Sequence, residues 1–538
     1  MDIEEVKTPS RRTFLKGATA AVATAAAASL FGCSGGGQQA DEAQVEDISW
    51  DEEADVLIVG GGLAGMSAAV TVATEGAGAT CLLLEKGDSE LGDGNSPFSG
   101  GVVMFGNQGE EANLLAYLKE LRQHEETGTP DDVLEAFANE LCKNLDWVRE
   151  LGAEEGEYEI REAGTSCWPE HPELEHSVFN NAFHFAINEN KERDHVTKFM
   201  YDVLKDMPEV THKKKAQLTK LIQDPETKTV LGGIYSDGRS EISVRANKGV
   251  ILTCGGFENN PQMMANYFSQ PKAKPLAAKQ NTGDCYSMCA DLKAEFWHMN
   301  AGAGFWNAFC KLDDTAVGGF TPAKSFGITV GKNGRRYYMD WDGVVTLDWD
   351  AVNAGTDHSM AVGSRHGHMQ FGGDWPHLPM PDISWFIFDQ AAFDAGAYKK
   401  QGTDPVAEGF GFKADTIEEL AQQADIIADS LVDTVDTWNM FCANGKDLAF
   451  YRPAKTLTPI STPPYYAVKC RSQILNTDGG PVRNAKAEII DLEGNPIPHL
   501  YSAGEFGSVW SGIYQGAGNL GECMAFGRIA ARSALGNE

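Results

Sequence analysis

The stretch Asp55-Val56-Leu57-Ile58-Val59-Gly60-Gly61-Gly62-Leu63-Ala64-Gly65 decides the fold of this 538-residue chain. Its first five residues form the short, largely β-branched apolar run that is typical of a buried parallel strand. Gly60, Gly62 and Gly65 then satisfy the pattern G-x-G-x-x-G, and small apolar residues continue from 66 to 73 as a helix packed on a sheet requires. Such glycines permit a tight turn, close approach to a pyrophosphate and close contact between helix and strand.

A second apolar run at Cys81-Leu82-Leu83-Leu84 ends in Glu85. An acidic side chain about twenty residues after the glycine turn is placed to accept a hydrogen bond from a ribose hydroxyl. The N-terminus of the intervening helix offers unpaired N–H groups to phosphates. We therefore predict a βαβ unit that binds a dinucleotide, with a purely structural βαβ unit as the alternative. The residues predicted to bind are Gly60, Gly62, Leu63, Ala64, Gly65, Glu85 and Lys86.

Two further segments favour FAD over NAD as the dinucleotide. A loop of small residues, 94–101, follows the second strand, and a C-terminal return runs through Leu500–Glu505 into the glycine-rich stretch 516–521 and a helix predicted over 522–534. A carboxylate at Glu505 can hold ribityl hydroxyls, and amides at a helix start can face the flavin pyrimidine oxygen. The further residues predicted to bind FAD are Asn95, Ser96, Ser99, Gly100, Gly101, Gly255, Asp284, Glu505, Asn519 and Leu520.

The charge and cysteine content exclude several other classes of protein. With 77 acidic against 44 basic residues, the formal net charge is -33, which disfavours nucleic acid and anionic membrane surfaces as partners. The eleven cysteines include no C-x-x-C and no C-x-x-C-H, so neither haem attachment nor a cluster is indicated. The nearest pair, Cys285 and Cys289, would lie one helical turn apart, and we predict no metal site.

The N-terminal residues 1–33 have the pattern of a targeting segment. Ser10-Arg11-Arg12-Thr13-Phe14-Leu15-Lys16 precedes an Ala-rich apolar run and resembles a twin-arginine export signal, which carries folded, cofactor-loaded proteins. The run is too short for a membrane span. It ends at Cys33 in what resembles a lipoprotein processing site, with ordinary cleavage nearby as the alternative. We predict an extracytoplasmic protein whose only membrane contact is a lipid anchor at Cys33, followed by a flexible linker over 34–52.

Several motifs together resemble one family of FAD-binding proteins. They are the glycine turn, Gly249 through Phe257, Asn281-Thr282-Gly283-Asp284, Val330 through Tyr337, and Asn476 through Pro481. The family includes soluble fumarate reductases, urocanate-type reductases and 3-ketosteroid dehydrogenases. The resemblance implies an α/β fold, in which a Rossmann-like doubly wound FAD-binding domain in two pieces, 53–278 and 473–538, surrounds an inserted α+β clamp domain over 279–472.

The chain departs from the fumarate reductases at the residues that hold a dicarboxylate. Ala323, beside Lys324, stands where that subfamily has its catalytic arginine, and Asn476 stands where it has a histidine. Without such cationic groups a dicarboxylate would be poorly neutralised in a low-dielectric cleft. Fumarate is therefore an unsuitable substrate. The histidine that links flavin covalently in the membrane-bound complexes is also absent near Asn95, so we expect non-covalent FAD.

The segment Tyr514-Gln515-Gly516-Ala517-Gly518 instead resembles the Y-x-G-x-G unit of the ketosteroid dehydrogenases. The resemblance implies that the Tyr514 hydroxyl and the Gly518 amide bind the substrate carbonyl, with Tyr514 as mere packing the alternative. Two donors on one oxygen would stabilise the enolate-like charge that develops there. A second tyrosine of that subfamily is missing near Gly343 and Val344, which argues against a standard steroid dehydrogenation.

The proton donor is predicted in the densest titratable segment, Ser364-Arg365-His366-Gly367-His368. Arg365 or His366 is the first choice. Tyr337 and Tyr338 are further candidates, while Arg335 and Arg336 occupy a family position that is usually structural. Many aromatic residues in the clamp would form an apolar slot for a flat ring, so an enone or an aromatic or polycyclic carbonyl compound suits better than a small acid.

These observations predict hydride transfer between flavin N5 and a carbon–carbon bond conjugated to a carbonyl, most simply by an enone-type reductase fed by a separate electron-donor protein or a quinone. One alternative is a ketosteroid-like dehydrogenase that runs in the oxidative direction. Another is an exported flavoprotein that only transfers electrons.

Overall fold

The structure is a computed structural model, and its residues 49–538 form one compact unit. The residues that it describes are 49–122, 125–154, 158–162, 174–176, 181–187, 192–194, 196–268, 270–276, 278–315, 324–341, 368–369, 373–374, 381–398 and 402–537. The predicted export signal, Cys33 and nearly all of the predicted linker lie outside them. Within the described part, no helix combines the length and apolar character that a membrane crossing needs.

The core of the molecule is an eight-stranded sheet with β1 (Glu52–Val59) inside it. Neighbouring strands follow the order β21-β22-β10-β1-β2-β7, and the pairs from β22 to β7 are parallel. The residues from Val56 to Val59 are buried, because both faces of the sheet are covered. The other strands are β2 (Cys81–Leu84), β7 (Val210–Lys213), β8 (Gln217–Gln223), β9 (Val230–Ser236), β10 (Glu241–Leu252), β21 (Glu488–Ile490) and β22 (Pro496–Ser502).

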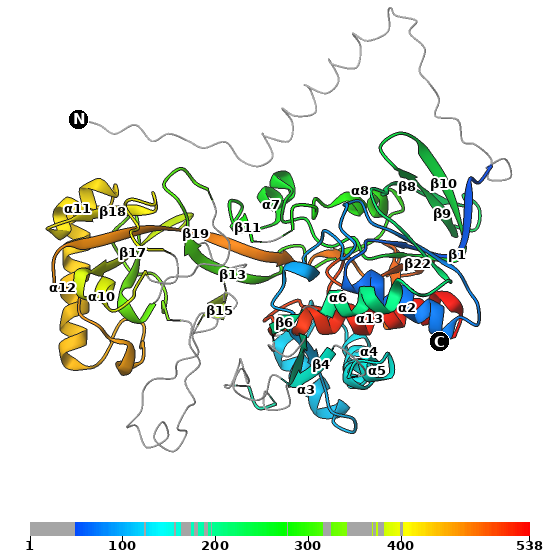
Figure 1. The fold of residues 1–538 in the computed structure, drawn as a ribbon, viewed down its shortest axis with the longest axis horizontal. Coiled ribbons are helices and arrows are strands. Elements are labelled where there is room, and N and C mark those ends of the chain that lie inside the picture. The colour runs from blue at the N-terminus through cyan, green and yellow to red at the C-terminus, as the bar shows by residue number, and fades with distance from the viewer. Residues whose placement is uncertain are drawn as a thin grey trace, which may run out of the picture. The chain divides into compact units, whose positions relative to one another are not determined.

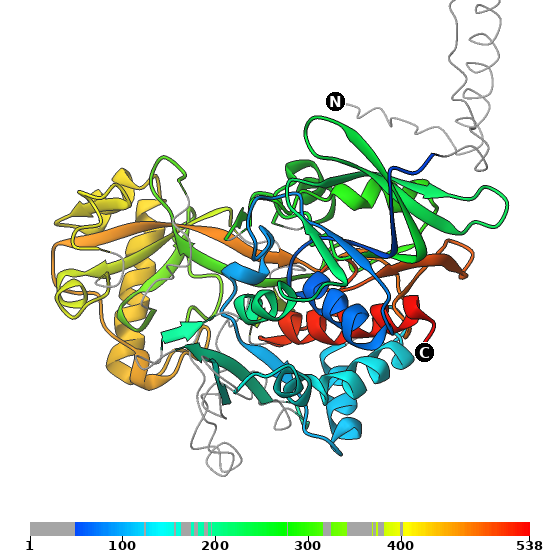
Figure 2. The ribbon, with the colours of Figure 1, turned by 45° about the vertical axis from the view of Figure 1, so that its right-hand side comes forward.

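Two helices from opposite ends of the sequence pack side by side on this sheet. α2 (Leu63–Glu75) follows β1, and α13 (Gly518–Leu535) runs along it (Figures 1 and 2). The approach is close because Gly527 has no side chain: a Cβ there would lie 2.7 Å from the Ala64 carbonyl oxygen. α13 begins at Gly518 instead of the predicted Glu522, since the turn before it tightens directly into the helix. The doubly wound α/β core predicted from the sequence is confirmed.

A six-stranded sheet is built around the long strand β19 (Tyr465–Thr477), within the region predicted as the clamp. β13, β17 and β18 pair with β19 in antiparallel fashion, and β14 extends the sheet beyond β17. β19 continues through the predicted boundary at residue 472, and the domain limits stay predictions. The elements of this region are β11 (Lys274–Pro275), β13 (Gly302–Phe309), β14 (Ile328–Gly331), β17 (Ile383–Asp389), α10 (Gln390–Asp394), β18 (Gly411–Ala414), α11 (Ile417–Gln423) and α12 (Ala428–Asn444).

A smaller four-stranded sheet and several helices complete the described fold. The sheet contains β3 (Val103–Phe105), β4 (Tyr158–Glu162), β5 (Asn181–Ile187) and β6 (Glu192–Asp194). The helices are α3 (Glu111–Arg122), α4 (Asp131–Leu141), α5 (Asn144–Glu150), α6 (Val196–Leu204), α7 (Pro261–Tyr267) and α8 (Asp284–Asp291). Two short strand pairs are β12 (Phe296–Trp297) with β20 (Gly480–Pro481), and β15 (His368–Met369) with β16 (Gly373–Asp374).

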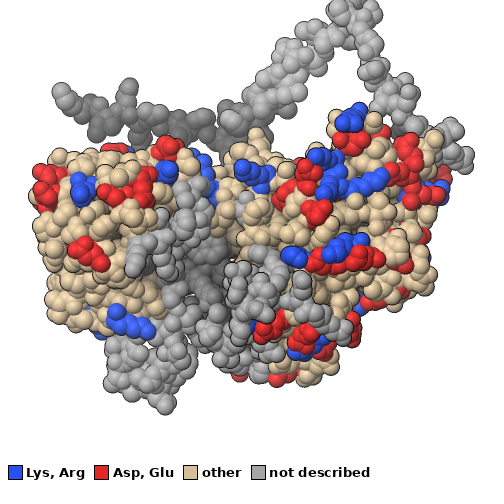
Figure 3. Space-filling view, viewed as in Figure 1, with Lys and Arg blue, Asp and Glu red and all other residues tan. Residues whose placement is uncertain are grey.

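Acidic and basic side chains lie intermingled on the described surface of the face in Figure 3. Mixed charge of this kind gives no continuous basic surface on that face for a polyanion to follow. The absence of a nucleic-acid partner remains a prediction.

Candidate active site

A cleft lies at the carboxyl ends of β1, β2 and β10, where ligands bind in doubly wound sheets. Segments that are far apart in the sequence meet there, including the turn after β1, the loop after β2, the end of β19 and the start of α13. The predicted site residues that line it are Gly60, Gly62, Leu63, Ala64, Glu85, Lys86, Asn95, Ser96, Ser99, Gly100, Gly255, Asp284, Glu505, Tyr514, Asn519 and Leu520. Gly65, Gly101 and Gly518 are not among the lining residues.

The glycine turn is packed too closely for side chains at two of its three fingerprint positions. Gly60 has φ +111°, and a Cβ there would lie 2.3 Å from the Thr253 carbonyl oxygen. A Cβ on Gly65 would lie 1.9 Å from the Gly60 carbonyl oxygen. At Gly62 the nearest atom would be Ser96 Oγ at an ordinary 3.4 Å. Gly65 therefore brings helix and strand together, while Gly62 leaves space open toward the cleft.

Glu85 is held in place by backbone amides at the end of β2. Its Oε2 accepts a hydrogen bond from the Gly61 N–H at 3.0 Å, and its Oε1 accepts one from the Gly87 N–H at 2.7 Å. Carboxylate oxygens can each accept two bonds, so Glu85 retains capacity for ribose hydroxyls. Next to it, Lys86 Nζ donates to Asp284 Oδ2 at 2.6 Å and thereby fixes the start of α8 against the cleft.

The other end of the cleft is formed by the C-terminal return. Tyr514 is 4% exposed, and its ring packs edge-on against Trp510 with the centroids 5.5 Å apart. Its hydroxyl accepts a hydrogen bond from the Asn519 N–H at 3.4 Å, in the first turn of α13. A tyrosine hydroxyl and a helix N-terminus therefore meet at one place in the cleft wall. Both are suited to stabilise negative charge on an oxygen.

Gly518 differs from the arrangement expected from the sequence. Its N–H donates to the Gln515 carbonyl at 2.9 Å, which closes the turn before α13. A Cβ there would lie 2.2 Å from the Trp510 ring, so the glycine is needed for packing. The amide is thus engaged within the protein, and the prediction that it binds a substrate carbonyl would require this turn to open.

Sequence reasoning missed two residues that organise the cleft, Glu258 and Asn281. Glu258 is 3% exposed, and its Oε1 accepts 2.8 Å hydrogen bonds from both Asn95 Nδ2 and Asn281 Nδ2. The same two amides donate to Glu505 Oε1 and Oε2 respectively, each at 3.2 Å. The available signal was that Glu258 directly follows the Gly255-Gly256-Phe257 motif.

Burial gives the two glutamates unusual proton affinities. It raises the pKa of Glu258 to about 7, although hydrogen bonds from the Asn95 and Asn281 amides oppose the shift. Burial, followed by the neighbouring charge of Glu258, raises the pKa of Glu505 well above its ordinary range. Strongly perturbed carboxyl groups beside a cleft are typical of functional sites.

Asp478 is a third buried carboxyl group near the cleft. Its Oδ1 accepts from Asn476 Nδ2 at 2.9 Å and from Asn519 Nδ2 at 3.4 Å. Its Oδ2 and the Asn519 Oδ1 have no hydrogen-bond partner among the described residues. Burial, followed by the charge of Glu522, raises the pKa of Asp478 well above its ordinary range. Asn476 stands where the fumarate reductases have a histidine. Its side-chain amide donates a hydrogen bond to the Asp478 carboxyl group.

The structure describes some of the predicted proton donors but not all of them. Arg365 and His366 lie outside the described residues, and their role stays a prediction. Tyr337 and Tyr338 do not line the cleft, and Tyr337 accepts a hydrogen bond from Asn307 Nδ2 at 2.9 Å. Arg336 is buried and pairs with Asp340 and Asp447, as a structural residue would.

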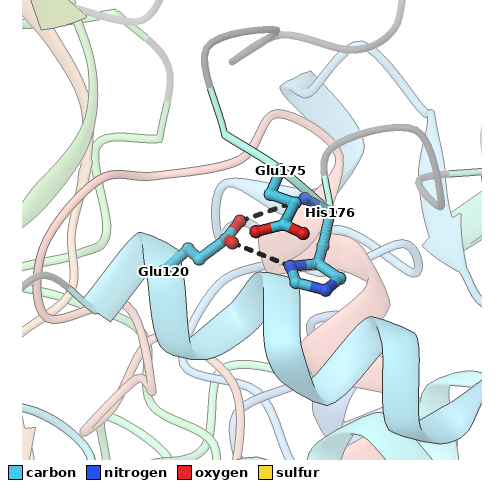
Figure 4. A group of neighbouring side chains, drawn as sticks. All are labelled: Glu120, Glu175 and His176. Atoms are coloured by element: carbon cyan, nitrogen blue, oxygen red, sulfur yellow. Dashed lines mark hydrogen bonds and ion pairs between the residues drawn. The ribbon is translucent and has the colours of Figure 1, made fainter.

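Two groups of side chains have the atoms that could bind a metal ion, but neither gives evidence that it does so. Cys285 and Cys289 are buried free thiols on α8. Elsewhere Glu120 on α3, Glu175 and His176 bring their ligand atoms within 4.8 Å of one another (Figure 4). Glu120 is already engaged, because its Oε1 lies 2.7 Å from His176 Nδ1 and its Oε2 accepts from the His176 N–H. The prediction of no metal site stays a prediction.

The family model described as FAD binding domain matches residues 55–520. The chain therefore belongs to this family, and it is an FAD-dependent oxidoreductase that acts on CH–CH groups. The residues of the cleft fit the cofactor, because Gly62 leaves space open at the glycine turn and the carboxyl groups of Glu85 and Glu505 line the cleft as acceptors that sugar hydroxyls could use.

A digoxin reductase from Eggerthella lenta is 28% identical, with the match covering 97% of this chain and 96% of that protein. A 3-oxosteroid 1-dehydrogenase from Mycobacterium tuberculosis is 30% identical over 56% of each chain. The crystal structure of a 3-ketosteroid delta1-dehydrogenase from Sterolibacterium denitrificans, in complex with 1,4-androstadiene-3,17-dione, aligns with a TM-score of 0.72 at 20% identity. It covers 90% of this chain and 100% of its own, and at that identity the likeness shows the fold.

Proposed function

We propose that the protein is an exported reductase of carbon–carbon double bonds conjugated to a carbonyl group. The observation that carries this proposal is the position of Tyr514, whose buried ring lines the same cleft as Glu505 and the first turn of α13. A tyrosine hydroxyl at a carbonyl oxygen stabilises the negative charge that grows there when the conjugated double bond is reduced.

The charge of the cleft supports a neutral substrate. Among the described residues that line it, Lys86 is the only cationic side chain, and it is paired with Asp284. Asn519, whose N–H donates to the Tyr514 hydroxyl, has an uncharged side chain, as do Leu475 and Asn476 elsewhere in the lining. A dicarboxylate would have no cation there to offset its desolvation, whereas an enone or a polycyclic carbonyl compound loses little on entering.

Once reduced by two electrons, bound FAD would supply a hydride from its N5 position. The protein's own contributions are to hold the cofactor's adenosine part through Glu85 and the glycine turn, and its ribityl part through Glu505. The Tyr514 hydroxyl binds the carbonyl oxygen, so hydride adds at the β-carbon and a proton adds at the α-carbon. Arg365 or His366 is proposed to deliver that proton. A separate electron-donor protein, or a membrane quinol that is oxidised to its quinone, returns the two electrons.

The relatives support the reductive direction more than the oxidative one. The digoxin reductase matches over nearly the whole chain, whereas the 3-oxosteroid 1-dehydrogenase matches over about half of it. The dehydrogenase remains the second candidate, because its identity is 30% and a ketosteroid dehydrogenase shares the fold. We further propose export by the twin-arginine route, with Cys33 as a lipid anchor and FAD held non-covalently.

Anaerobic mixing of the reduced holoprotein with a panel of ligands tests the proposal. Flavin absorbance should recover with cyclic enones and stay bleached with the matched saturated ketones and with isolated alkenes. Tyr514→Phe should slow recovery by about a hundred- to a thousandfold, since it removes one donor from the oxyanion. Its reaction with a one-electron dye should be unchanged.

The two alternative functions predict different results in the same anaerobic mixing experiment. A dehydrogenase would bleach when the oxidised holoprotein meets a saturated ketone. A protein that only transfers electrons would react with the dye alone, and Tyr514→Phe would alter nothing. Flavin that stays reduced with every conjugated alkene would overturn the proposed function.

A further inference from the structure

Four side chains form a closed ring of hydrogen bonds in the wall of the cleft. Glu258 and Glu505 are bridged twice, once by the side-chain amide of Asn95 and once by that of Asn281. Each amide nitrogen lies 2.8 Å from Glu258 and 3.2 Å from Glu505. A primary amide has two N–H donors, so each one can serve both carboxyl groups. Asn95, Asn281 and Glu505 line the cleft, whereas Glu258 lies behind them.

The ring is anchored on the side away from the cleft. Asn95 Oδ1 accepts from the Ala278 N–H at 3.2 Å, which fixes the orientation of this amide. Glu258 Oε2 accepts from the Thr477 hydroxyl at 3.4 Å, at the end of β19. Glu258 therefore connects the loop after β2 and the segment before α8 to the two large sheets.

No cation neutralises the two carboxyl groups among the described residues. Neither Glu258 nor Glu505 forms an ion pair there, and the titratable groups that act on them are other acids or neutral groups. The charge of Asp478 raises the pKa of Glu505. The charges of Glu258 and Glu505 raise the pKa of Tyr286 on α8, and the charge of Glu505 raises that of Cys523 on α13. Two buried like charges in one hydrogen-bonded group cannot both remain ionised without a large cost.

We propose that Glu258 is a positioning residue for FAD, which holds Glu505 toward the cofactor through Asn95 and Asn281, and that the ring carries one proton when FAD is bound. With one proton present, every amide N–H of the ring faces an acceptor and the net charge is a single negative one. Without it, repulsion pushes Glu505 away from Glu258 and disturbs the surface on which the ribityl chain would lie.

The proposal rests on the prediction that Glu505 contacts FAD, and it links FAD affinity to pH. When FAD covers the Glu258–Glu505 ring, water is excluded from the two carboxyl groups. The pKa of the shared proton is therefore higher in the FAD-bound protein than in the FAD-free protein. FAD affinity should then fall as pH rises through neutrality, by up to about tenfold per pH unit for one linked proton. The substitution Glu258→Gln mimics the protonated, uncharged form of Glu258. The glutamine side-chain oxygen can still accept hydrogen bonds from the amides of Asn95 and Asn281.

The test measures FAD release from the full-length holoprotein on dilution, by the fluorescence of free FAD, between pH 6 and 9. Wild type should lose affinity steeply across this range, whereas Glu258→Gln should be nearly flat and equal wild type at low pH. Glu258→Ala should bind about tenfold more weakly at every pH, because two amides lose their acceptor. Glu140→Gln, at a buried carboxylate paired with Arg528, is the matched control and should keep the wild-type slope.

Equal pH slopes in wild type and Glu258→Gln would overturn the proposal, whether or not Glu258→Ala folds. A separate variant, Glu505→Ala, isolates the underlying prediction: unchanged FAD affinity in it would show that Glu505 does not contact the cofactor. Because release is measured without turnover, failure of the proposed reductase activity leaves this test intact.

Discussion

Buried charges are paired with opposite charges near the sheet around β19, whereas the buried acids beside the cofactor cleft have no cationic partner among the described residues. Near the sheet, Arg336 pairs with Asp340 at 3.1 Å and with Asp447 at 2.9 Å, and Arg452 pairs with Asp340 at 3.1 Å. Both guanidinium carbons lie 4.8 Å from the ring of Trp438. Two cations and two anions therefore balance around one aromatic side chain.

Beside the cleft, the buried or partly buried carboxyl groups of Glu258, Glu505 and Asp478 form no ion pair with a described residue. Their partners are the uncharged amides of asparagines. We infer from this difference that the balanced network stabilises the scaffold, whereas the acids without a cationic partner belong to a site for a cofactor or substrate.

The largest effect is expected when the balanced network is broken. Asp447→Asn leaves Arg336 and Arg452 with one carboxylate between them, and should cost about 3–5 kcal/mol of unfolding free energy. Urea unfolding measures it. The matched control is Asp433→Asn, whose exposed pair with Arg335 spans 3.7 Å and should matter by less than about 1 kcal/mol. Equal losses in the two variants would contradict the comparison.

The pH dependence of stability should differ in sign between paired and unpaired carboxyl groups. Because the folded pKa of Glu258 is raised to about 7, its contribution is present below its ordinary pKa and is lost as pH rises through about 7. The loss is on the order of 3 kcal/mol. The pKa of Glu140 is lowered to about 2, so its contribution is lost as pH falls through the acid range.

Urea unfolding from pH 2 to 9 measures both arms of this profile. Glu258→Gln should remove only the loss of stability that develops as pH rises from about 4.5 to 7. Glu140→Gln should remove only the loss that develops as pH falls below about 4.5. If both variants kept the wild-type profile, the charges assigned to the two sites would be wrong.

A smaller effect is expected at the glycine turn, where it separates packing from cofactor binding. Gly65→Ala should destabilise the protein by about 1–3 kcal/mol, because its Cβ would overlap the Gly60 carbonyl. Gly62→Ala should leave the stability of the FAD-free protein nearly unchanged, since its Cβ has ordinary space, yet it should reduce FAD content. FAD-to-protein ratio and thermal unfolding distinguish the two. Identical behaviour of both variants would count against separate roles.

Local sequence patterns were enough to predict many of the residues that line the cleft, whereas their contacts with FAD stay predictions. The turn at Gly60, the acid at Glu85 and the helix start at Asn519 each depend on spacing within a few residues or within one βαβ unit, and all three line the cleft. β2 was predicted at its observed bounds because a continuous apolar run of this length forms a buried parallel strand.

The other features of the site depend on contacts between distant segments, which the spacing of residues in the sequence does not reveal. Glu258 meets Asn95 across 163 residues, and only the folded chain brings the two loops together. The engaged Gly518 amide follows from the tight turn before α13, which the motif alone does not show. For Arg365 and His366 the residue types suggest proton transfer, but their chemistry depends on a position relative to the flavin that lies outside the described residues.

The central claim is that FAD lies along this cleft, with its diphosphate at the glycine turn and its ribityl chain on Glu505. A crystal structure of the holoprotein tests it most directly. We expect diphosphate oxygens within hydrogen-bond distance of the backbone near Gly62 and a ribityl hydroxyl within hydrogen-bond distance of a Glu505 oxygen. FAD bound with either group elsewhere, or with Glu505 turned away toward solvent, would contradict it.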